Sequence, residues 1–262
     1  MTTIGVLRET VPGDRRVALV PADVGRLRQA GLDVLVESEA GAGAWHDDAA
    51  YTAAGAEIAD RGRVYAKSDV LLCVSTPADL DELRAGQTLI GLLTDRPPVP
   101  AGVTAVSFHL IPRTLSRAQA MDALTSQANV AGYKAALVAA DAYAGFLPML
   151  VTAAGTTRPA RVLVLGAGIA GLQALATARR LGAIVTGYDV REAARGDIAS
   201  TGAAVLTLET PAATGDGGYA RRLSADETAL QQQALNAAIA GFDNVITTAQ
   251  GPGGGAARQG PA

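Results

Sequence analysis

A glycine-rich segment in the second half of the chain has the spacing of a dinucleotide-binding loop. Gly166, Gly168 and Gly171 form G-x-G-x-x-G directly after the apolar run RVLVL and at the start of a helical pattern. In such a loop the first glycine makes the tight turn and the second lets a pyrophosphate approach the backbone, while the third allows close packing of helix on strand. The helix N-terminus then offers N–H groups and partial positive charge to the phosphates.

Asp189 ends the next apolar run and completes this pattern. A carboxylate at this position binds both ribose hydroxyls of NAD and repels the 2′-phosphate of NADP. Gly182 predicts the end of the intervening helix. Arg191 has two interpretations, one as a side chain stacked near the adenine and one as a solvated residue in a first helical turn. The segment therefore predicts a site for NAD(H).

The elements that must position this loop alternate between strands and helices along the whole chain. Continuous apolar runs separated by helices are typical of parallel sheets covered on both faces. The predicted strands are residues 4–7, 33–37, 69–74, 88–93, 104–109, 161–165, 183–188, 204–209 and 243–248. The predicted helices are 21–30, 47–56, 169–181, 191–200 and 225–240. We therefore expect an α/β fold of two Rossmann-like domains with parallel sheets.

Residues 116–136, SRAQAMDALTSQANVAGYKAA, predict one further helix that has an almost uncharged polar face. Ser116 and Gln119 match a capping box, S-x-x-Q, at its start. An apolar and a polar stripe recur at helical spacing: Met121, Leu124, Ala128, Ala131 and Ala135 in the first, and Gln119, Asp122, Ser126, Asn129 and Tyr133 in the second. The polar stripe either serves only the helix cap and dipole, or faces a polar ligand held by the second domain.

Composition excludes several classes of protein. The 262 residues are 49% hydrophobic, which is globular, and a net charge of -3 with 4% aromatic residues argues against nucleic-acid binding. One cysteine and two distant histidines, His46 and His109, exclude a disulfide framework and predict no metal site. No run reaches the roughly 18–20 apolar residues of a membrane span, and the N-terminus is no signal peptide. We expect a cytoplasmic chain with no membrane span of its own.

Three segments carry a family resemblance: SRAQAMD, AAGTTRPARVLVLGAGIAGLQA and GGYA. With them the chain resembles the NAD(H)-binding component (alpha subunit, domain I) of proton-translocating NAD(P) transhydrogenase, which is similar to alanine dehydrogenase in fold. The resemblance runs from residues 13–21 to residues 245–249. It implies an enzyme of the proton-translocating type and not of the Si-specific type. Such an enzyme transfers hydride directly and reversibly between NAD(H) on this chain and NADP(H) on a partner.

The resemblance also assigns contacts with the cofactor. It places Arg113, Gln119 and Asp122 at the nicotinamide end. The segment PRTLSRAQ is one residue longer than the family's PRISRAQ, so Arg117 is the alternative to Arg113. The other implied contacts are Ile169, Ala170, Gly171, Asp189, Val190, Arg191, Gly218, Tyr219, Gln231 and Ala249. Of these, Gly218 and Tyr219 match a mobile loop that closes over the nucleotide.

The resemblance further implies partners and a domain plan. The partners are NADP(H)-binding and membrane subunits and a second copy of this chain. The partner subunits would hold this chain peripherally at the inner face of the cell membrane. We expect an N-terminal domain over residues 1–145, including the helix 116–136, and an NAD-binding domain over 146–249. After residue 249 the family continues, whereas this chain reads QGPGGGAARQGPA. We therefore expect four of about six strands in the NAD-binding domain, which is incomplete at its C-terminal end, and a disordered tail over 250–262.

Two alternatives stay open at this point. An alanine-type amino-acid dehydrogenase needs a Lys and a His to hold and protonate a keto acid. The expected Lys is Cys73 here and the segment LIGLLTDRP offers no His, so Arg16 would have to act alone. The other alternative is a non-catalytic, truncated remnant that binds nucleotide weakly or serves as an interaction module.

Overall fold

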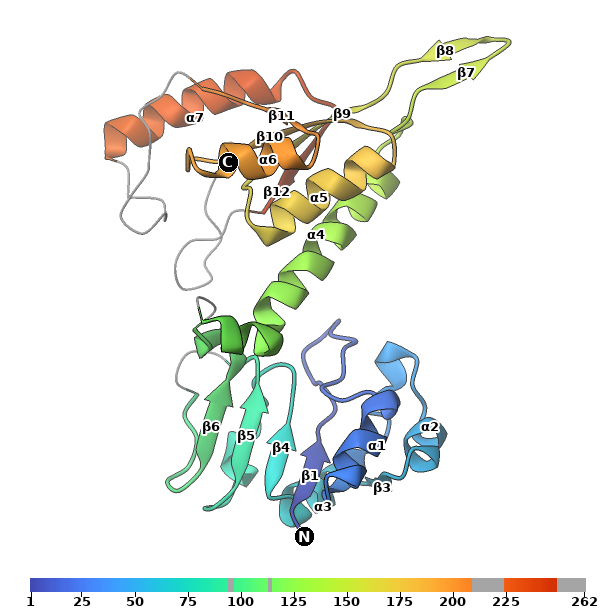
Figure 1. Ribbon diagram of the computed structural model, residues 1–262, viewed down its shortest axis with the longest axis vertical. Helices are drawn as coiled ribbons and strands as arrows, with labels where there is room; N and C mark the ends of the chain where they lie inside the picture. Colours follow the sequence, from blue (N-terminus) through green and yellow to red (C-terminus); the bar gives the residue numbers. More distant parts are fainter. Residues whose placement is uncertain (94–96, 113–114, 209–223, 249–262) are drawn as a thin grey trace. The chain divides into compact units, whose positions relative to one another are not determined.

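The structure is a computed structural model that describes residues 1–93, 97–112, 115–208 and 224–248 (Figure 1). The chain divides into two compact units, Met1–Leu124 and Thr125–Ala262. The tail 250–262, for which the sequence predicts disorder, lies outside the described residues.

The first unit alternates short strands with short helices. Its strands are β1 (Thr3–Val6), β2 (Asp33–Glu37), β3 (Glu57–Ala59), β4 (Val70–Leu72), β5 (Thr88–Gly91) and β6 (Thr104–Ser107). Its α-helices are α1 (Pro21–Gln29), α2 (Asp48–Ala53) and α3 (Arg61–Lys67), and its 3₁₀ helices are η1 (Ala42–Ala44), η2 (Leu80–Glu82), η3 (Phe108–Leu110) and η4 (Ser116–Met121). Side-chain caps explain two of the starts, because Asp47 accepts from the Ala50 N–H and Asp60 from the Arg63 N–H.

These strands form one parallel sheet in the order β3-β2-β1-β4-β5-β6. Successive side chains on a strand point to opposite faces, and each face has its own core. On β2, Val34 and Val36 pack with Val24 and Tyr51 on one face, whereas Leu35 packs on the other face with the residues around Tyr65. Burial on both faces is the reason that these strands read as continuous apolar runs.

The second unit repeats this design on a smaller scale. Its main elements are β9 (Arg161–Leu165), α5 (Ile169–Arg180), β10 (Ile184–Tyr188), α6 (Ala194–Ser200), β11 (Ala204–Val205), α7 (Ala225–Ile239) and β12 (Asn244–Thr247). The four strands are parallel, in the order β11-β10-β9-β12. Along β9, Val162 and Val164 belong to one core, and Leu163 and Leu165 to the other. The expected α/β class, the parallel sheets and the count of four strands are therefore confirmed for the described residues.

All nine predicted strands are present, but three of the strands in the described part of the chain were not predicted. One is β3, which has only three residues. The others are β7 (Leu150–Thr152) and β8 (Gly155–Thr157), which form an antiparallel hairpin that extends from the second unit (Figure 1). Its segment, LVTAAGTT, has neither the length nor the buried run of the sheet strands.

The prediction of one continuous helix over 116–136 is wrong. Residues 116–121 form the 3₁₀ helix η4, and the α-helix α4 begins anew at Ala123 and runs to Ala142. Asp122 separates them with φ −77° and ψ 72°, outside the helical region, and Asp is favoured directly before a helix start. Ser116 is not the cap either, because Leu115 stands at that position and no side chain caps η4.

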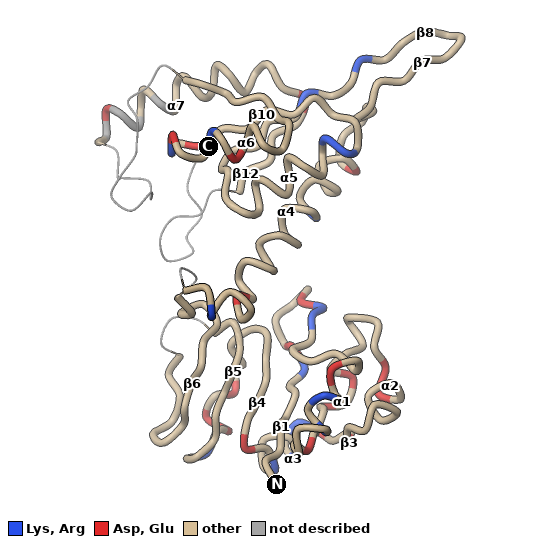
Figure 2. The backbone as a smooth tube through the Cα atoms, in the orientation of Figure 1, with Lys and Arg blue, Asp and Glu red and all other residues tan. Residues whose placement is uncertain are grey.

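The two stripes are therefore broken at Asp122. Of the apolar stripe, Met121 is 50% exposed, and the buried residues of α4 are instead Gly132 and Ala136. The remaining surface of α4 is nearly uncharged, with only Lys134 and Asp141 among its twenty residues (Figure 2). No helix among the described residues has the length and apolar character to cross a membrane.

The compact units divide at Leu124, which differs from the expected boundary near residue 145. The reason is that α4 contributes to the core of the second unit. Ala136 is buried there with Ala174 and Ala178 of α5, and Ala139 and Ala140 pack against the same core.

Candidate functional site

The glycine loop has the conformation that each of its glycines predicts. Gly166 has φ +97°, a left-handed conformation that favours glycine, and it turns the chain from the buried strand β9. Gly168 stands immediately before α5 in an extended conformation, and an added Cβ would meet no atom within 4 Å. The first N–H groups of α5, from Ile169 onward, have no acceptor within the helix. The loop thus presents open space and N–H donors, which suits a pyrophosphate.

Two close backbone contacts fix the first turn of α5. A Cβ at Gly171 would lie 1.8 Å from the carbonyl oxygen of Gly166, so only glycine lets the helix approach the strand turn. A Cβ at Gly132, on α4, would lie 2.0 Å from the carbonyl oxygen of Ala170. The residue at position 132 was not predicted to matter. It places the backbone of α4 directly against the nucleotide loop.

Asp189 follows β10 and binds the same loop. Its carboxylate accepts from the Ala167 N–H at 2.7 Å and from the Arg191 N–H at 2.8 Å. The Arg191 side chain donates to it as well, through Nε at 3.0 Å and the terminal nitrogen at 3.1 Å. Arg191 is therefore the ion-pair partner of Asp189, and α6 begins only at Ala194. Burial alone would raise the pKa of Asp189, but these hydrogen bonds hold that pKa below its ordinary value.

Thr248, directly after β12, is a loop contact that was not predicted. Its hydroxyl donates to the carbonyl oxygen of Gly166 at 2.9 Å and lies 3.2 Å from that of Leu165. Its N–H donates to the Leu165 carbonyl at 2.8 Å. The sequence signal for Thr248 was its position at the carboxyl end of a predicted strand. Only the pairing of β12 with β9, which the sequence does not show, places Thr248 beside the glycine turn.

Replacement of Thr248 by valine should weaken NADH binding about fivefold, because one net hydrogen bond is worth about 1 kcal/mol. Thr248→Ser keeps the hydroxyl and should bind as the unchanged protein does. Calorimetric titration with NADH measures both. If Thr248→Val binds NADH normally, or if Thr248→Ser loses as much affinity, the hydroxyl does not position the loop.

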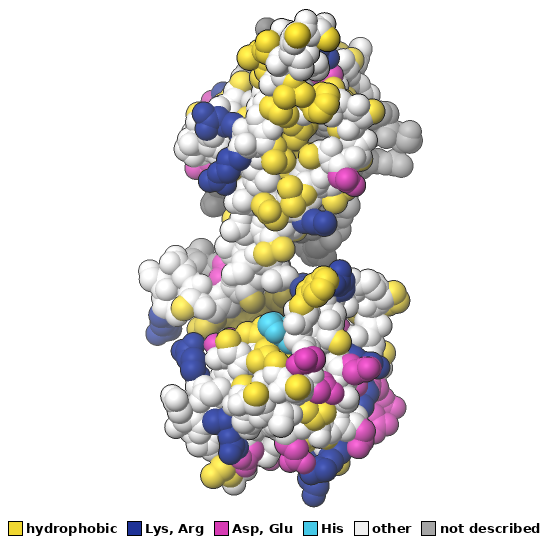
Figure 3. All heavy atoms as spheres, turned by 90° about the vertical axis from the view of Figure 1, so that its right-hand side faces the viewer, with side chains coloured by type: hydrophobic (Ala, Val, Ile, Leu, Met, Phe, Trp, Pro, Cys, Tyr) yellow, Lys and Arg dark blue, Asp and Glu magenta, His cyan; other side chains and the backbone are white. Residues whose placement is uncertain are grey.

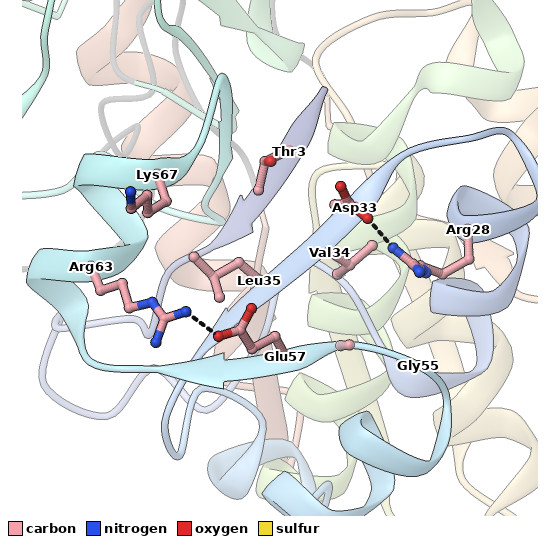
Figure 4. Close-up of a pocket in the computed structure, with 10 residues that line it drawn as sticks. Thr3, Arg28, Asp33, Val34, Leu35, Gly55, Glu57, Arg63 and Lys67 are labelled. Atoms are coloured by element: carbon pink, nitrogen blue, oxygen red, sulfur yellow. Dashed lines mark hydrogen bonds and ion pairs between the residues drawn. The ribbon is translucent and has the colours of Figure 1, made fainter. Parts of the chain in front are cut away.

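A cavity of about 530 Å³ in the first unit lies away from any predicted site residue (Figure 4). It opens at the amino ends of β1, β2 and β3, where Thr3, Asp33 and Glu57 line it. Most of the charged side chains that line it form ion pairs with one another, because Arg28 pairs with Asp33 and Arg63 pairs with Glu57. Ligands of open parallel sheets bind at the carboxyl ends, so we do not assign the nucleotide to this cavity.

The chain is similar to known proteins in both of its units. Residues 5–131 match the family model "Alanine dehydrogenase/PNT, N-terminal domain", and residues 135–258 match "Alanine dehydrogenase/PNT, C-terminal domain". The chain is 42% identical over 268 residues to the first of the polypeptides that make up NAD(P) transhydrogenase subunit alpha of Rhodospirillum rubrum, covering 95% of this chain and 70% of that protein.

The chain belongs to the alanine dehydrogenase/PNT family.

Two further comparisons place the chain within that family. A crystal structure of transhydrogenase from Sinorhizobium meliloti matches with a TM-score of 0.82 and 38% identity, over 98% of this chain and 72% of that one. Alanine dehydrogenase of Mycobacterium tuberculosis is 34% identical over 200 residues, which is 71% of this chain and 53% of that protein. The family resemblance is thus confirmed, and so is the Rossmann-like fold.

The structure brings together only some residues of the predicted family site. In the second unit, Ile169, Ala170, Gly171, Asp189 and Arg191 surround one loop, and Val190 packs partly buried behind it. In the first unit, Gln119 is exposed on η4, Asp122 follows it, and Arg117 is exposed. Arg113, Gly218, Tyr219 and Ala249 lie outside the described residues, as does the side chain of Gln231 on α7.

The residues at the positions that an alanine-type dehydrogenase would use, Cys73 and Arg16, make hydrogen bonds within the protein. Cys73, at the position of the expected lysine, is 4% exposed, and its thiol donates to the carbonyl of Ile90. Burial raises the pKa of Cys73 to about 12, so the thiol stays protonated. Arg16 donates to the carboxylate of Asp14 through Nε at 2.9 Å and a terminal nitrogen at 2.6 Å. These contacts leave no catalytic acid or base at these positions.

Proposed function

We propose that the chain is the NAD(H)-binding subunit of a proton-translocating NAD(P) transhydrogenase. The observation that carries this proposal is the loop after β9, where Gly168 leaves open space and the Ala167 N–H donates to the carboxylate of Asp189. The identity to the transhydrogenase subunit of Rhodospirillum rubrum supports the same assignment.

In this proposal the chain positions its nucleotide and takes no part in bond making. Hydride passes directly between the C4 atoms of two nicotinamides once they are about 3–3.5 Å apart, so no acid, base or metal is required. The N–H groups of the first turn of α5 hold the pyrophosphate, and the carboxylate of Asp189 receives the ribose hydroxyls. The second nucleotide, NADP(H), belongs to a partner chain.

We further propose that Gln119 and Asp122 contact the nicotinamide end, with Arg113 or Arg117 beside them. This assignment rests on the family motif SRAQAMD. The exposure of Gln119 on η4 supports a contact role, and its backbone carbonyl, which accepts from the Asp122 N–H at 3.2 Å, belongs to the 3₁₀ hydrogen bonds of η4. A backbone contact of this kind survives a change of the Gln119 side chain.

Gln119→Asn should slow hydride transfer about 10- to 100-fold while it changes the Kd for NADH by less than about threefold. The shorter side chain displaces the amide by one methylene length, and a misplacement near 1 Å costs up to about 100-fold in rate. Single-turnover transfer between NADH and an NADP analogue, in a complex reconstituted with partner subunits, gives the rate. Ala120→Ser, an exposed neighbour on η4, is the matched control. A normal transfer rate in Gln119→Asn would refute the assigned role.

We propose that partner subunits and a second copy of the chain cover the apolar surface of the second unit. The partner subunits then hold the chain peripherally at the inner face of the cell membrane. Apolar side chains gather on one side of this unit (Figure 3). The exposed apolar residues of this unit include Val138, Phe146, Met149 and Val151, and Val151 on the hairpin is 69% exposed. Exposed apolar side chains that gather in this way are typical of surfaces that contact another protein.

A further inference from the structure

Trp45, the single tryptophan of the chain, lies exposed on the loop between β2 and α2. Its side chain is 87% exposed, although burial of a large aromatic ring is a main source of stability. Its backbone is left-handed, with φ 67° and ψ 25°. A residue with a Cβ adopts this conformation at a cost, so glycine is favoured at such a position. The packing of the first unit therefore gives no reason for a tryptophan here.

Hydrogen bonds within the chain do not explain Trp45 either. Among the described residues, only Glu39 and Trp45 have a positive φ without being glycine. The Glu39 N–H donates to Asp48 at 2.9 Å and its carboxylate pairs with Arg8, so its conformation has partners. The indole of Trp45 makes no hydrogen bond within the described part of the chain. Strained residues of this kind cluster at functional positions.

Arg15, on the loop after β1, fixes the position of this ring. Its Nε donates to the Gly43 carbonyl at 3.0 Å, and its guanidinium lies 5.6 Å from the centre of the Trp45 ring. The two loops touch at Gly43, where a Cβ would lie 3.1 Å from the Arg15 backbone. No carboxylate of the described residues forms an ion pair with Arg15, in contrast to Arg8 and Arg16. The two side chains thus offer an aromatic ring and an unneutralised positive charge at the surface.

Both loops lie at the carboxyl edge of the first sheet, as does η4 with Gln119 (Figure 1). Trp45 follows β2 and Gln119 follows β6, four strands along the sheet, which is about 20 Å at the usual strand spacing. A specific interface covers about 800 Å² on each partner, a patch about 30 Å across. A chain that brings a second nicotinamide to Gln119 can therefore cover Trp45 and Arg15 with the same interface.

We propose that Trp45 and Arg15 anchor the NADP(H)-binding partner chain on the first unit. Tryptophan and arginine are the residue types that most often dominate the affinity of protein interfaces. Trp45 enters an apolar pocket of the partner chain, and Arg15 meets a carboxylate at the rim of that pocket. The inference rests on the proposed function, since it takes the partner to be the chain that supplies the second nucleotide.

An anchor of this kind separates affinity for the partner from stability of the chain itself. Trp45→Gly should weaken association with the purified NADP(H)-binding chain about 30-fold or more, measured by calorimetric titration. The thermal unfolding midpoint of Trp45→Gly alone should not fall, because glycine adopts the left-handed conformation without strain. Trp45→Phe keeps a ring and should recover part of the affinity. Neither variant should change the Kd for NADH.

Two further measurements use the ring and the charge separately. In the unchanged chain, acrylamide should quench the fluorescence of Trp45, and this quenching should be lost in the complex, with the partner chain alone as background. Arg15→Ala should weaken association about tenfold and make it less sensitive to salt. Arg26→Ala is the matched control, because Arg26 is 84% exposed in the last turn of α1, which leads to the amino edge of the sheet. It should associate as the unchanged chain does.

Three results would overturn the anchor: normal association of Trp45→Gly, unchanged quenching of Trp45 in the complex, or a lower unfolding midpoint of Trp45→Gly. The last would show that the ring packs within its own chain. Failure of the proposed function is a different result, in which the unchanged chain does not associate with the NADP(H)-binding chain at all. If the unchanged chain and Trp45→Gly associate equally well, only the anchor fails.

Discussion

Replacement of Gly168 by valine should weaken NADH binding at least 100-fold and leave the fold unchanged. The backbone at Gly168 has φ −77° and ψ −171°, which valine adopts without strain, and an added Cβ would contact no atom of the chain. The new side chain therefore fills only the space that the pyrophosphate needs. Fluorescence or calorimetric titration gives the affinity, and thermal unfolding gives the stability.

The matched control is Gly196→Val, since a Cβ at that helical glycine also meets no atom but lies outside the nucleotide loop. This variant should retain both NADH affinity and stability. If Gly168→Val binds NADH as well as Gly196→Val does, the pyrophosphate does not lie at the start of α5.

The opposite outcome is expected at Gly132. Gly132→Val should lower the free energy of unfolding of the second unit by about 3 kcal/mol, because its Cβ would lie 2.0 Å from a backbone oxygen that cannot move without α5. NADH affinity should fall with it, since Ala170 belongs to the first turn of α5. Denaturant unfolding measures the loss of stability. Equal stability of Gly132→Val and Gly196→Val would contradict the close packing of α4 on α5.

The glycine loop could be predicted from the sequence because its requirements are local. Gly166 needs a positive φ, and strand β9 needs an unbroken apolar run since its residues alternate between two cores. The same argument predicted the other long strands. It failed for β3 and for the β7–β8 hairpin, whose short segments bury too little apolar surface to leave a pattern.

Interactions between distant segments could not be predicted in this way. Periodicity runs without interruption through Asp122, because Asp fits either a helix interior or the position before a helix, and only the backbone angles distinguish the two. Gly132 and Thr248 acquire their importance from neighbours far along the chain, Ala170 and Gly166.

The central claim, that Asp189 and the loop after β9 form an NAD(H) site, is tested most directly by titrating the purified chain with NADH and with NADPH. We expect saturable binding of NADH with an affinity at least tenfold higher than that of NADPH, because the ionised carboxylate repels the 2′-phosphate. Asp189→Asn should narrow this difference, since the change also releases Arg191 to meet the phosphate. Equal affinities for the two nucleotides would contradict the role of Asp189, and absence of binding to either would favour a non-catalytic remnant.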